Sequence, residues 1–265
     1  MKLAIIGLGN MGTALLEGII DSGILRVEDI IGCDIKVNNK EKNPEYRDIR
    51  TIKNNKFGVK KADVVLLAVK PQVIDQVLDD IRGVLDGKLL ISIAAGISLS
   101  HLKRNIPPSV RTVRVMPNTP ALIGKGISAF CCDPDLEAGE KEFVGNLLAG
   151  AGEVVEIEEE LMDAVTGLSG SGPAFVYIII EALADAGVLN GLNREDALKL
   201  AAATVEGTAA MVRESGLHPA ELKDMVTSPG GTTINGVRSL EEAGLRSALI
   251  EAVKTAADRS RELGD

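Results

Sequence analysis

Aromatic side chains are nearly absent, and their scarcity sets the first limits on function. Among 265 residues there is no Trp, and there are two Tyr and four Phe. Proteins that bind single-stranded nucleic acid or sugars by stacking need aromatic rings, so both classes are excluded. Apolar residues still make up 45% of the chain. The core must therefore be built from Ala, Val, Ile and Leu.

Basic residues are in the minority. Lys and Arg number 29 against 38 Asp and Glu, which gives a net charge of −9. This balance disfavours binding to a phosphate backbone, which relies on a basic patch, so we expect no nucleic-acid partner. A small anionic ligand stays compatible with the sequence, because local backbone dipoles can outweigh a distant net charge.

Cysteine and histidine are scarce as well. Cys33, Cys131 and Cys132 show no paired spacing, which argues against a disulfide framework and favours a reducing, cytoplasmic location. His101 and His218 lie far apart, so we expect no bound metal. No basic region precedes a long apolar stretch at the N-terminus, and no apolar run approaches the ~18 residues of a membrane span. We therefore expect neither a signal peptide nor a membrane segment.

Glycine, by contrast, is abundant, with 28 residues. It punctuates a chain whose first two-thirds alternates short apolar runs with helical patterns. The predicted strands are Lys2–Ile6, Ile30–Cys33, Val64–Val69, Leu89–Ala94, Arg111–Met116, Ile127–Cys132 and Glu153–Ile157. The predicted helices run from Met11 to about Ser22, Gln72 to about Leu85, Leu99 to about Asn105, and Leu136 to about Ala149. This alternation predicts an α/β fold with a doubly wound parallel sheet.

Two regions depart from that alternation. Residues 36–56 are rich in Lys, Asn and Glu with little apolar periodicity, so we predict a mobile, solvated segment there. From about Glu159 the pattern becomes helical only, and Pro173–Val188 is apolar nearly all round, which predicts a buried helix. Further helices follow from Asn193 to Ser215, from Pro219, from Thr232 to Ala243 and from Leu245 to Leu263. We predict two domains, residues 1–158 and 159–265, and an oligomer whose interface lies in the second.

A glycine-rich turn follows the first strand at once and opens a helix. It reads Gly7-Leu8-Gly9-Asn10-Met11-Gly12. In this context Gly7 allows a tight turn, Gly9 lets the backbone approach a pyrophosphate, and Gly12 lets the helix pack on the strand. The helix N-terminus then faces the phosphates. The turn predicts a nicotinamide dinucleotide as cofactor.

The second strand ends at Asp34, which bears on the choice between NAD and NADP. An acid at this position binds the ribose 2′-hydroxyl and would repel a 2′-phosphate. Lys36 and Lys40 follow and can offset that repulsion. The choice between NADPH and NADH therefore stays open.

Small and polar residues end the next strands at the same sheet edge, where ligands bind in such folds. They are Ala68-Val69-Lys70-Pro71, Ala94-Ala95-Gly96 and Met116-Pro117-Asn118-Thr119-Pro120. The small residues leave room for a nicotinamide ring, and Asn118 can hydrogen-bond a carboxamide or a ribose.

In the helical half, residues 166–173 and 227–233 combine hydroxyls with glycines before a helix. Exposed backbone N–H groups and the helix dipole suit a carboxylate there without any Arg. No Ser/His/Asp arrangement or cysteine nucleophile is evident, and no His sits where it would polarise a carbonyl. A protonated imine is a hydride acceptor that needs no such acid, so the enzyme need only position it.

These residues resemble the pyrroline-5-carboxylate reductase family over essentially the full length. The glycine turn, Val69-Lys70-Pro71, Met116 with Asn118-Thr119-Pro120, and residues 164–174 and 222–233 appear in the family's order. The last two stretches are specific, whereas the first is shared with many dehydrogenases. The resemblance implies a Rossmann-type domain followed by an all-helical dimerisation domain, and NAD(P)H-dependent reduction of 1-pyrroline-5-carboxylate to L-proline. It also implies dimers that interlock through the helices and assemble further, commonly as decamers.

The resemblance also implies roles for particular residues. Asn55 matches an adenosine-side contact, and Lys70 and Asn118 lie along the nicotinamide half. Thr166 matches a residue that hydrogen-bonds near the imine nitrogen. The loop that holds the substrate carboxylate in the family is matched by Ser228, Gly231, Thr232 and Thr233.

Three alternatives stay open. One is a reductase of another small cyclic imine. Another is a β-hydroxyacid dehydrogenase, although residues 173–177 lack the Lys that it requires. The third is a cofactor-binding regulatory or assembly protein, against which Thr166 and residues 227–233 argue.

Overall fold

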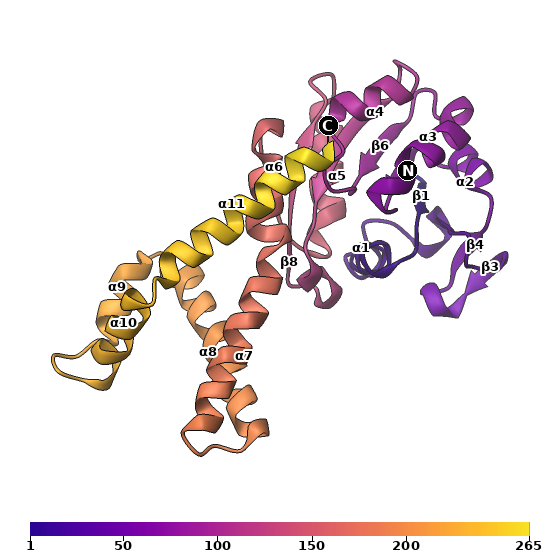
Figure 1. Cartoon of the computed structure of the whole chain (residues 1–265). Coiled ribbons are helices and arrows are strands. Elements are labelled where there is room, and N and C mark those ends of the chain that lie inside the picture. Colours follow the sequence, from indigo (N-terminus) through magenta and orange to yellow (C-terminus); the bar gives the residue numbers. More distant parts are fainter. Residues whose placement is uncertain (265) are drawn as a thin grey trace. The chain divides into compact units, whose positions relative to one another are not determined.

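The computed structural model describes residues 1–264 and divides into two compact units (Figure 1). The first unit holds Met1–Ser171 together with the stretch that starts at Lys254, and the second holds Gly172–Val253.

A nine-stranded sheet forms the centre of the first unit, counted over the described residues, in the order β3-β4-β2-β1-β5-β6-β7-β8-β9. The strands are β1 (Leu3–Ile6), β2 (Ile30–Cys33), β3 (Lys40–Asn43), β4 (Ile49–Ile52), β5 (Val64–Leu67), β6 (Leu89–Ser92), β7 (Arg111–Met116), β8 (Gly126–Cys132) and β9 (Gly152–Glu156). Neighbouring strands run parallel except for the β3–β4 and β7–β8 pairs. The predicted Rossmann-type parallel sheet is confirmed, and two antiparallel pairs are added to it.

Residues 36–56, predicted to be a mobile, solvated segment, form two strands, although most of their side chains are exposed as their composition predicts. They contain β3 and β4, and β4 pairs in parallel with β2. Polar groups carry the pairing: buried Asn43 donates from Nδ2 to Thr51 Oγ1 at 3.1 Å, and Thr51 Oγ1 donates to the Asn38 carbonyl at 2.9 Å. Because side-chain hydrogen bonds replace apolar alternation here, a pattern based on hydropathy misses the strands.

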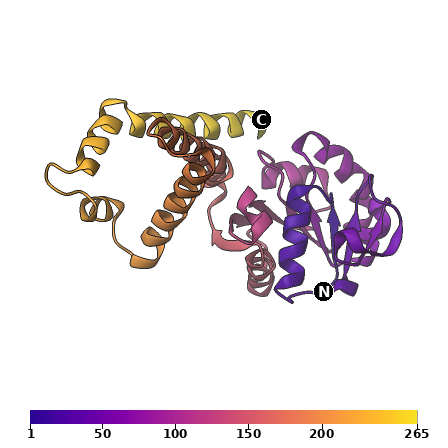
Figure 2. The ribbon, with the colours of Figure 1, turned by 90° about the horizontal axis from the view of Figure 1, so that it is seen from below.

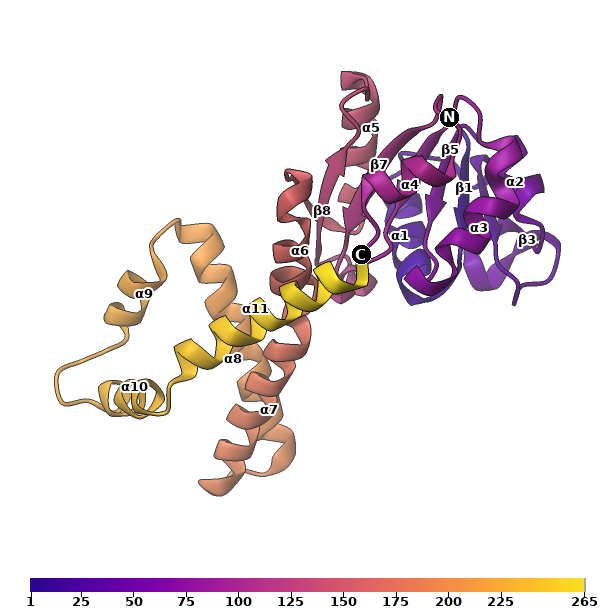
Figure 3. The same ribbon diagram turned by 45° about the horizontal axis from the view of Figure 1, so that its top comes forward.

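Helices cover both faces of the sheet (Figure 2, Figure 3). The helices α1 (Asn10–Asp21) and α5 (Ala138–Ala149) pack on one face, where Leu3 and Ile5 of β1 contribute to the core. The helices α2 (Asn55–Lys61), α3 (Ile74–Ile81) and α4 (Leu99–Asn105) lie on the other, with Ile6, Val65 and Leu67. Short 3₁₀ helices lie at Val27–Asp29, Pro44–Tyr46, Pro71–Val73, Arg82–Val84 and Thr119–Ile123. Both faces of the central strands are therefore buried, as continuous Val/Ile/Leu runs require.

The segment that leads out of the sheet is helical throughout. A 3₁₀ turn (Glu159–Leu161) is followed by α6 (Met162–Val165) and by one π-helical turn (Thr166–Gly170). Within the turn, the Thr166 hydroxyl donates to the Met162 carbonyl at 2.9 Å, and the Ser171 N–H donates to the Thr166 carbonyl at 2.8 Å. Residues 166–170, whose glycines and hydroxyls suggest a loop, thus form a widened helical turn.

The second unit is built from helices alone. They are α7 (Gly172–Leu189), α8 (Arg194–Ser215), α9 (Pro219–Met225), α10 (Thr232–Glu242) and the first part of α11 (Leu245–Gly264), which continues into the first unit. The helices α7 and α8 pack through Ala184, Ala197 and Ala201. Asn193 caps α8 by accepting the Asp196 N–H, and Gly216 ends it with φ +66°, as the sequence predicts.

The apolar helix α7, predicted to be buried in an oligomer, is largely exposed within a single chain. Within the described chain, Ala184 is the one buried residue of α7. Large apolar side chains on it are exposed: Val176, Tyr177, Ile178, Leu183 and Leu189. By length and composition, the helical stretch Glu159–Leu189 is also apolar enough to cross a membrane, which the expectation of no membrane segment did not foresee.

Candidate functional site

The candidate site lies where the strand order reverses. The strands that follow β1 in sequence extend the sheet to one side through β2, and those that follow β5 extend it to the other. The carboxyl ends of β1 and β5 therefore border a crevice, which is where open α/β sheets bind ligands. The chain holds this corner with backbone hydrogen bonds, from Gly7 N to the Cys33 carbonyl and from Ala68 N to the Ile6 carbonyl, both at 2.8 Å.

The three glycines of the first turn divide into two kinds. Gly7 has φ +99°, and a Cβ on it would lie 2.5 Å from the Ala68 carbonyl oxygen; a Cβ on Gly12 would lie 2.1 Å from the Gly7 oxygen. The fold itself therefore requires these two. A Cβ on Gly9 would meet nothing within 4 Å. Bare backbone facing an open crevice is the arrangement that admits a pyrophosphate at a helix N-terminus, so the turn fits a dinucleotide.

Two adjoining cavities of about 590 and 450 Å³ extend from this corner. The larger is bordered by α1, by Ile93–Ala95, by Met116–Thr119 and by Gly170. The smaller is bordered by Cys33–Lys36 and Asn55. Both are lined by Gly9, Ala68, Val69 and Lys70, so together they form an extended groove across the switch point.

The groove brings together most of the residues that the sequence singles out for a cofactor. These are Gly7, Gly9, Asn10, Met11, Asp34, Asn55, Ala68, Val69, Lys70, Pro71, Ala95 and Asn118. Gly12 packs behind the turn. Gly96 lies instead on a separate cavity of the same unit, where a Cβ would be 3.3 Å from Leu263 Cβ.

Asp34 has both carboxylate oxygens bound by the backbone. Oδ2 accepts the Leu8 N–H and Oδ1 accepts the Lys36 N–H, each at 2.8 Å. The carboxylate thus ties the glycine turn to the end of β2. Cys33 beside it is inert as a nucleophile, because burial and then the Asp34 charge raise the pKa of its thiol to about 12.

The opposite end of the groove is also rigid. Asn118 is nearly buried, and its Oδ1 accepts the Ile127 N–H at 2.9 Å. That bond directs the carboxamide and leaves Nδ2 as the group with which the side chain can donate. The Met116 methyl lies 2.4 Å from where a Cβ on Gly170 would be, so Gly170 lets β7 pack closely on the π-helical turn.

Some lining residues were missed by sequence reasoning. The smaller cavity is also bordered by Val73, which precedes α3, and by Gln76 and Val77 of α3. Their spacing of three and four residues places them on one helical face. The residues Ala68–Pro71 end a strand at the ligand-binding edge, and a helix is predicted directly after them. Helical periodicity counted from Pro71 would therefore have identified these three residues.

Thr166 is nearly buried, and its hydroxyl hydrogen is already donated to the Met162 carbonyl. Its oxygen is therefore available as an acceptor. In the second unit, α10 begins after Gly230 with φ +68° and has no side-chain cap. The N–H groups of the first turn, including those of Thr232 and Thr233, have no acceptor inside the helix. These are the properties of an anion-binding turn.

Comparison with known proteins agrees with this geometry. Residues 2–96 match a family model described as NADP oxidoreductase, coenzyme F420-dependent, and residues 159–263 match one described as pyrroline-5-carboxylate reductase dimerisation. The sheet, its groove and the helical region thus define a Rossmann-type oxidoreductase that uses a nicotinamide dinucleotide.

Full-length relatives identify the family. The chain is 45% identical to a pyrroline-5-carboxylate reductase of Methanosarcina acetivorans, over 99% of this chain and 98% of that protein. It is 46% identical to one of Synechocystis, over 100% and 98%. The crystal structure of Plasmodium falciparum pyrroline carboxylate reductase with NADP bound has a TM-score of 0.91 at 35% identity, covering 100% of this chain and 98% of that one. The chain belongs to the pyrroline-5-carboxylate reductase family.

The dimerisation match also explains the exposed apolar helix. Residues 159–263 include the stretch Glu159–Leu189 that is apolar enough to span a membrane. An apolar face that one chain leaves uncovered within a dimerisation region is buried by a second copy. The match thus implies a homo-oligomer and accounts for the apolar stretch without a membrane.

Proposed function

We propose that this chain transfers a hydride from NAD(P)H to the cyclic imine 1-pyrroline-5-carboxylate and yields L-proline, the last step of proline biosynthesis. The observation that carries the proposal is the intact groove at the switch point, in a chain that is similar to pyrroline-5-carboxylate reductases over its whole length.

The groove residues hold the cofactor, which supplies the hydride when bound. We assign the pyrophosphate to the Gly7–Gly12 turn, because Gly9 faces open space at the junction of the two cavities. The smaller cavity, with Asp34 and Asn55, takes the adenosine side. The larger takes the nicotinamide, bordered by Lys70, Ala95 and Asn118. Because Asn118 is held rigidly, its Nδ2 can orient a carboxamide at little cost in side-chain entropy.

Thr166 acts on the imine end of the substrate. Since its hydroxyl donates to the Met162 carbonyl, its oxygen can only accept. It therefore accepts the N–H of a protonated imine, the form that is already electrophilic. The imine nitrogen therefore carries its proton before hydride transfer, and Thr166 need not act as an acid.

The substrate carboxylate is held by Ser228, Gly231, Thr232 and Thr233. The uncapped start of α10 supplies backbone N–H donors, and the helix dipole adds attraction for a negative charge. The loop returns on itself through the Gly231 N–H, which donates to the Ser228 carbonyl at 3.1 Å. Recognition by main chain suits a small anion and explains the absence of a dedicated Arg.

Both NADPH and NADH are proposed as coenzymes. Asp34 would repel a 2′-phosphate, but its two oxygens are engaged by backbone N–H groups, and Lys36 lines the same cavity. The balance between the Asp34 and Lys36 charges then sets the preference. The match of residues 2–96 to an NADP oxidoreductase model supports use of the phosphorylated form.

We further propose a homodimer or a higher assembly such as a decamer, formed through residues 159–265, with residues 1–158 as the cofactor domain. Support comes from the dimerisation match and from the exposed face of α7. A cytoplasmic location is supported by three free thiols, of which Cys33 and Cys131 are buried. Light scattering at micromolar concentration tests the assembly, and a monomer would contradict it.

The activity is tested by mixing the purified chain with 1-pyrroline-5-carboxylate and either coenzyme. Loss of reduced nicotinamide absorbance must be matched by proline, identified by mass spectrometry. A reaction without substrate and a Thr233→Pro variant, which removes one N–H donor of α10, serve as controls. No proline above background with either coenzyme would refute the proposal.

A further inference from the structure

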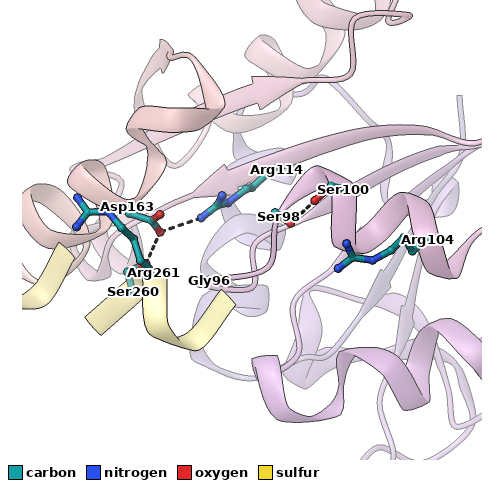
Figure 4. Close-up of a pocket in the computed structure, with 8 residues that line it drawn as sticks. All are labelled: Gly96, Ser98, Ser100, Arg104, Arg114, Asp163, Ser260 and Arg261. Atoms are coloured by element: carbon teal, nitrogen blue, oxygen red, sulfur yellow. Dashed lines mark hydrogen bonds and ion pairs between the residues drawn. The ribbon is translucent and has the colours of Figure 1, made fainter. Parts of the chain in front are cut away.

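A third cavity of the first unit, about 490 Å³, lies where the end of α11 meets α4, β7 and α6 (Figure 4). A network of three side chains crosses it. They are Arg114 of β7, Asp163 of α6 and Ser260 of α11. None of them borders the two cavities assigned to the cofactor.

One carboxylate oxygen joins the network. Ser260 Oγ donates to Asp163 Oδ1 at 2.6 Å, and Arg114 Nη2 reaches the same oxygen at 3.4 Å. Ser260 is 4% exposed and Arg114 is 5% exposed. The Asp163 side chain is 20% exposed, so this oxygen is held between two buried partners while part of the carboxylate faces solvent, and loss of either partner weakens its placement. The short bond to Ser260 is the stronger of the two by geometry.

The network lies one helical turn from Thr166. Asp163 precedes Thr166 by three residues in the same continuous helical segment, and the Thr166 hydroxyl bonds to Met162 next to Asp163. The orientation of Thr166 therefore follows the orientation of α6. A π-helical turn is held open only where its surroundings fix it, and such turns are frequent at functional sites.

The strand β7 contacts this segment at both ends. Arg114 and Met116 are two residues apart, so they point to one face of the strand. Arg114 reaches Asp163 before the π-helical turn, and Met116 packs on Gly170 at its end. Ser260 supplies the contact from α11, and Leu263 on the same helix lies against Gly96.

We propose that Asp163 and Ser260 are positioning residues for hydride transfer: the end of α11 orients α6 and thereby Thr166. The helix α11 lies within residues 159–263, which match the dimerisation model, and its end from Lys254 onward belongs to the first unit, where Ser260 contacts Asp163. This inference rests on the proposed function, because Thr166 is assigned to the imine there.

The test compares Ser260→Ala with wild type in the full-length chain. The hydroxyl is lost, α6 is released from α11, and kcat for 1-pyrroline-5-carboxylate falls about tenfold, as a misplacement of a positioning group predicts. The Kd for NADPH, measured by fluorescence titration, stays within about twofold, because the network lies outside the cofactor groove. Ser260→Thr keeps a hydroxyl and restores kcat. Arg259→Ala, the adjacent exposed position whose partner is Glu262, is the matched control and leaves kcat unchanged.

Asp163→Asn gives a second, isosteric test that keeps an acceptor but removes the charge. It lowers kcat as well, and its effect is not additive with Ser260→Ala because the two act through one network. Any of three results would overturn the inference. The first is a kcat for Ser260→Ala within twofold of wild type. The second is a rise in the Kd for NADPH as large as the fall in kcat, and the third is additivity of the effects of Ser260→Ala and Asp163→Asn on kcat. Wild type that forms no proline would instead refute the proposed function.

Discussion

Two glycines of the first turn, Gly9 and Gly12, should respond differently to substitution by Ala: Gly12→Ala should lower stability, and Gly9→Ala should not. In Gly12→Ala, the new methyl would lie 2.1 Å from the Gly7 carbonyl oxygen and 3.1 Å from Ala68 Cβ. The carbonyl belongs to the backbone, so no side-chain rotation relieves the overlap and α1 must move away from the turn. Overpacking of this kind costs about 1–3 kcal/mol of the free energy of unfolding.

Gly9→Ala should leave stability nearly unchanged. Its φ of −77° suits any residue, and the methyl meets nothing within 4 Å. We expect a change in the free energy of unfolding within about 0.5 kcal/mol. The methyl nevertheless projects into the junction of the two cavities, where we place the pyrophosphate. Loss of one charge-assisted hydrogen bond, worth about 1.5–3 kcal/mol, raises the Kd for NADPH about 10- to 100-fold.

The assay pairs two measurements on each variant. Chemical denaturation without coenzyme reports stability, and fluorescence titration reports the Kd for NADPH. Gly12→Ala should have a lower free energy of unfolding and a weaker affinity for NADPH, whereas Gly9→Ala should have a weaker affinity alone. Wild-type affinity in Gly9→Ala would refute the placement of the pyrophosphate. A loss of stability in Gly9→Ala as large as that in Gly12→Ala would refute the distinction between the two positions.

Three further predictions concern the reacting end, the coenzyme and a buried thiol. Thr166→Ala should lower kcat about 10- to 100-fold with little change in the Kd for NADPH, since the lost acceptor lies at the imine; unchanged kcat with weakened NADPH binding would place Thr166 on the cofactor. Lys36→Glu should raise KM for NADPH at least about fivefold and leave KM for NADH unchanged in steady-state assays, because the charge meets only the 2′-phosphate; equal effects would argue against this role. Burial raises the pKa of Cys33 from 9.0 to about 12. Its contribution to stability is therefore full below pH 9 and is lost as pH rises from 9 toward 12, so denaturation midpoints should fall between pH 8 and pH 10 in wild type and less so in Cys33→Ala.

The features predicted well from the sequence are those that one local pattern determines. The Gly7–Gly12 turn, the continuous apolar strands and the Asn193 cap each follow from residues close in sequence, and the structure contains all three. The groove follows too, because parallel strands end at one edge. Its placement needs only the strand order.

The features that were missed depend on contacts between distant residues. The pairing of β3 with β4 rests on Asn43 and Thr51, whose hydrogen bond leaves no hydropathy signal. In the π-helical turn Thr166–Gly170, Met116 from the distant strand β7 packs on Gly170, and neither this contact nor the turn can be distinguished from a loop by periodicity. The apolar composition of α7 predicts burial and an oligomer, but which of its side chains a single chain leaves exposed depends on tertiary packing that the sequence does not reveal.

The edge strand β3 has a consequence for how copies of this chain meet. Lys40, Glu41 and Lys42 stand exposed along it, and the opposite edge, β9, carries Glu153 and Glu156. A strand edge offers unpaired N–H and C=O groups to any neighbouring chain, and charges along it discourage such pairing. Both edges of the sheet are thus protected against open-ended pairing of strands between chains. The apolar side chains that α7 leaves exposed offer a different surface for self-association, one that two copies can bury without pairing strands.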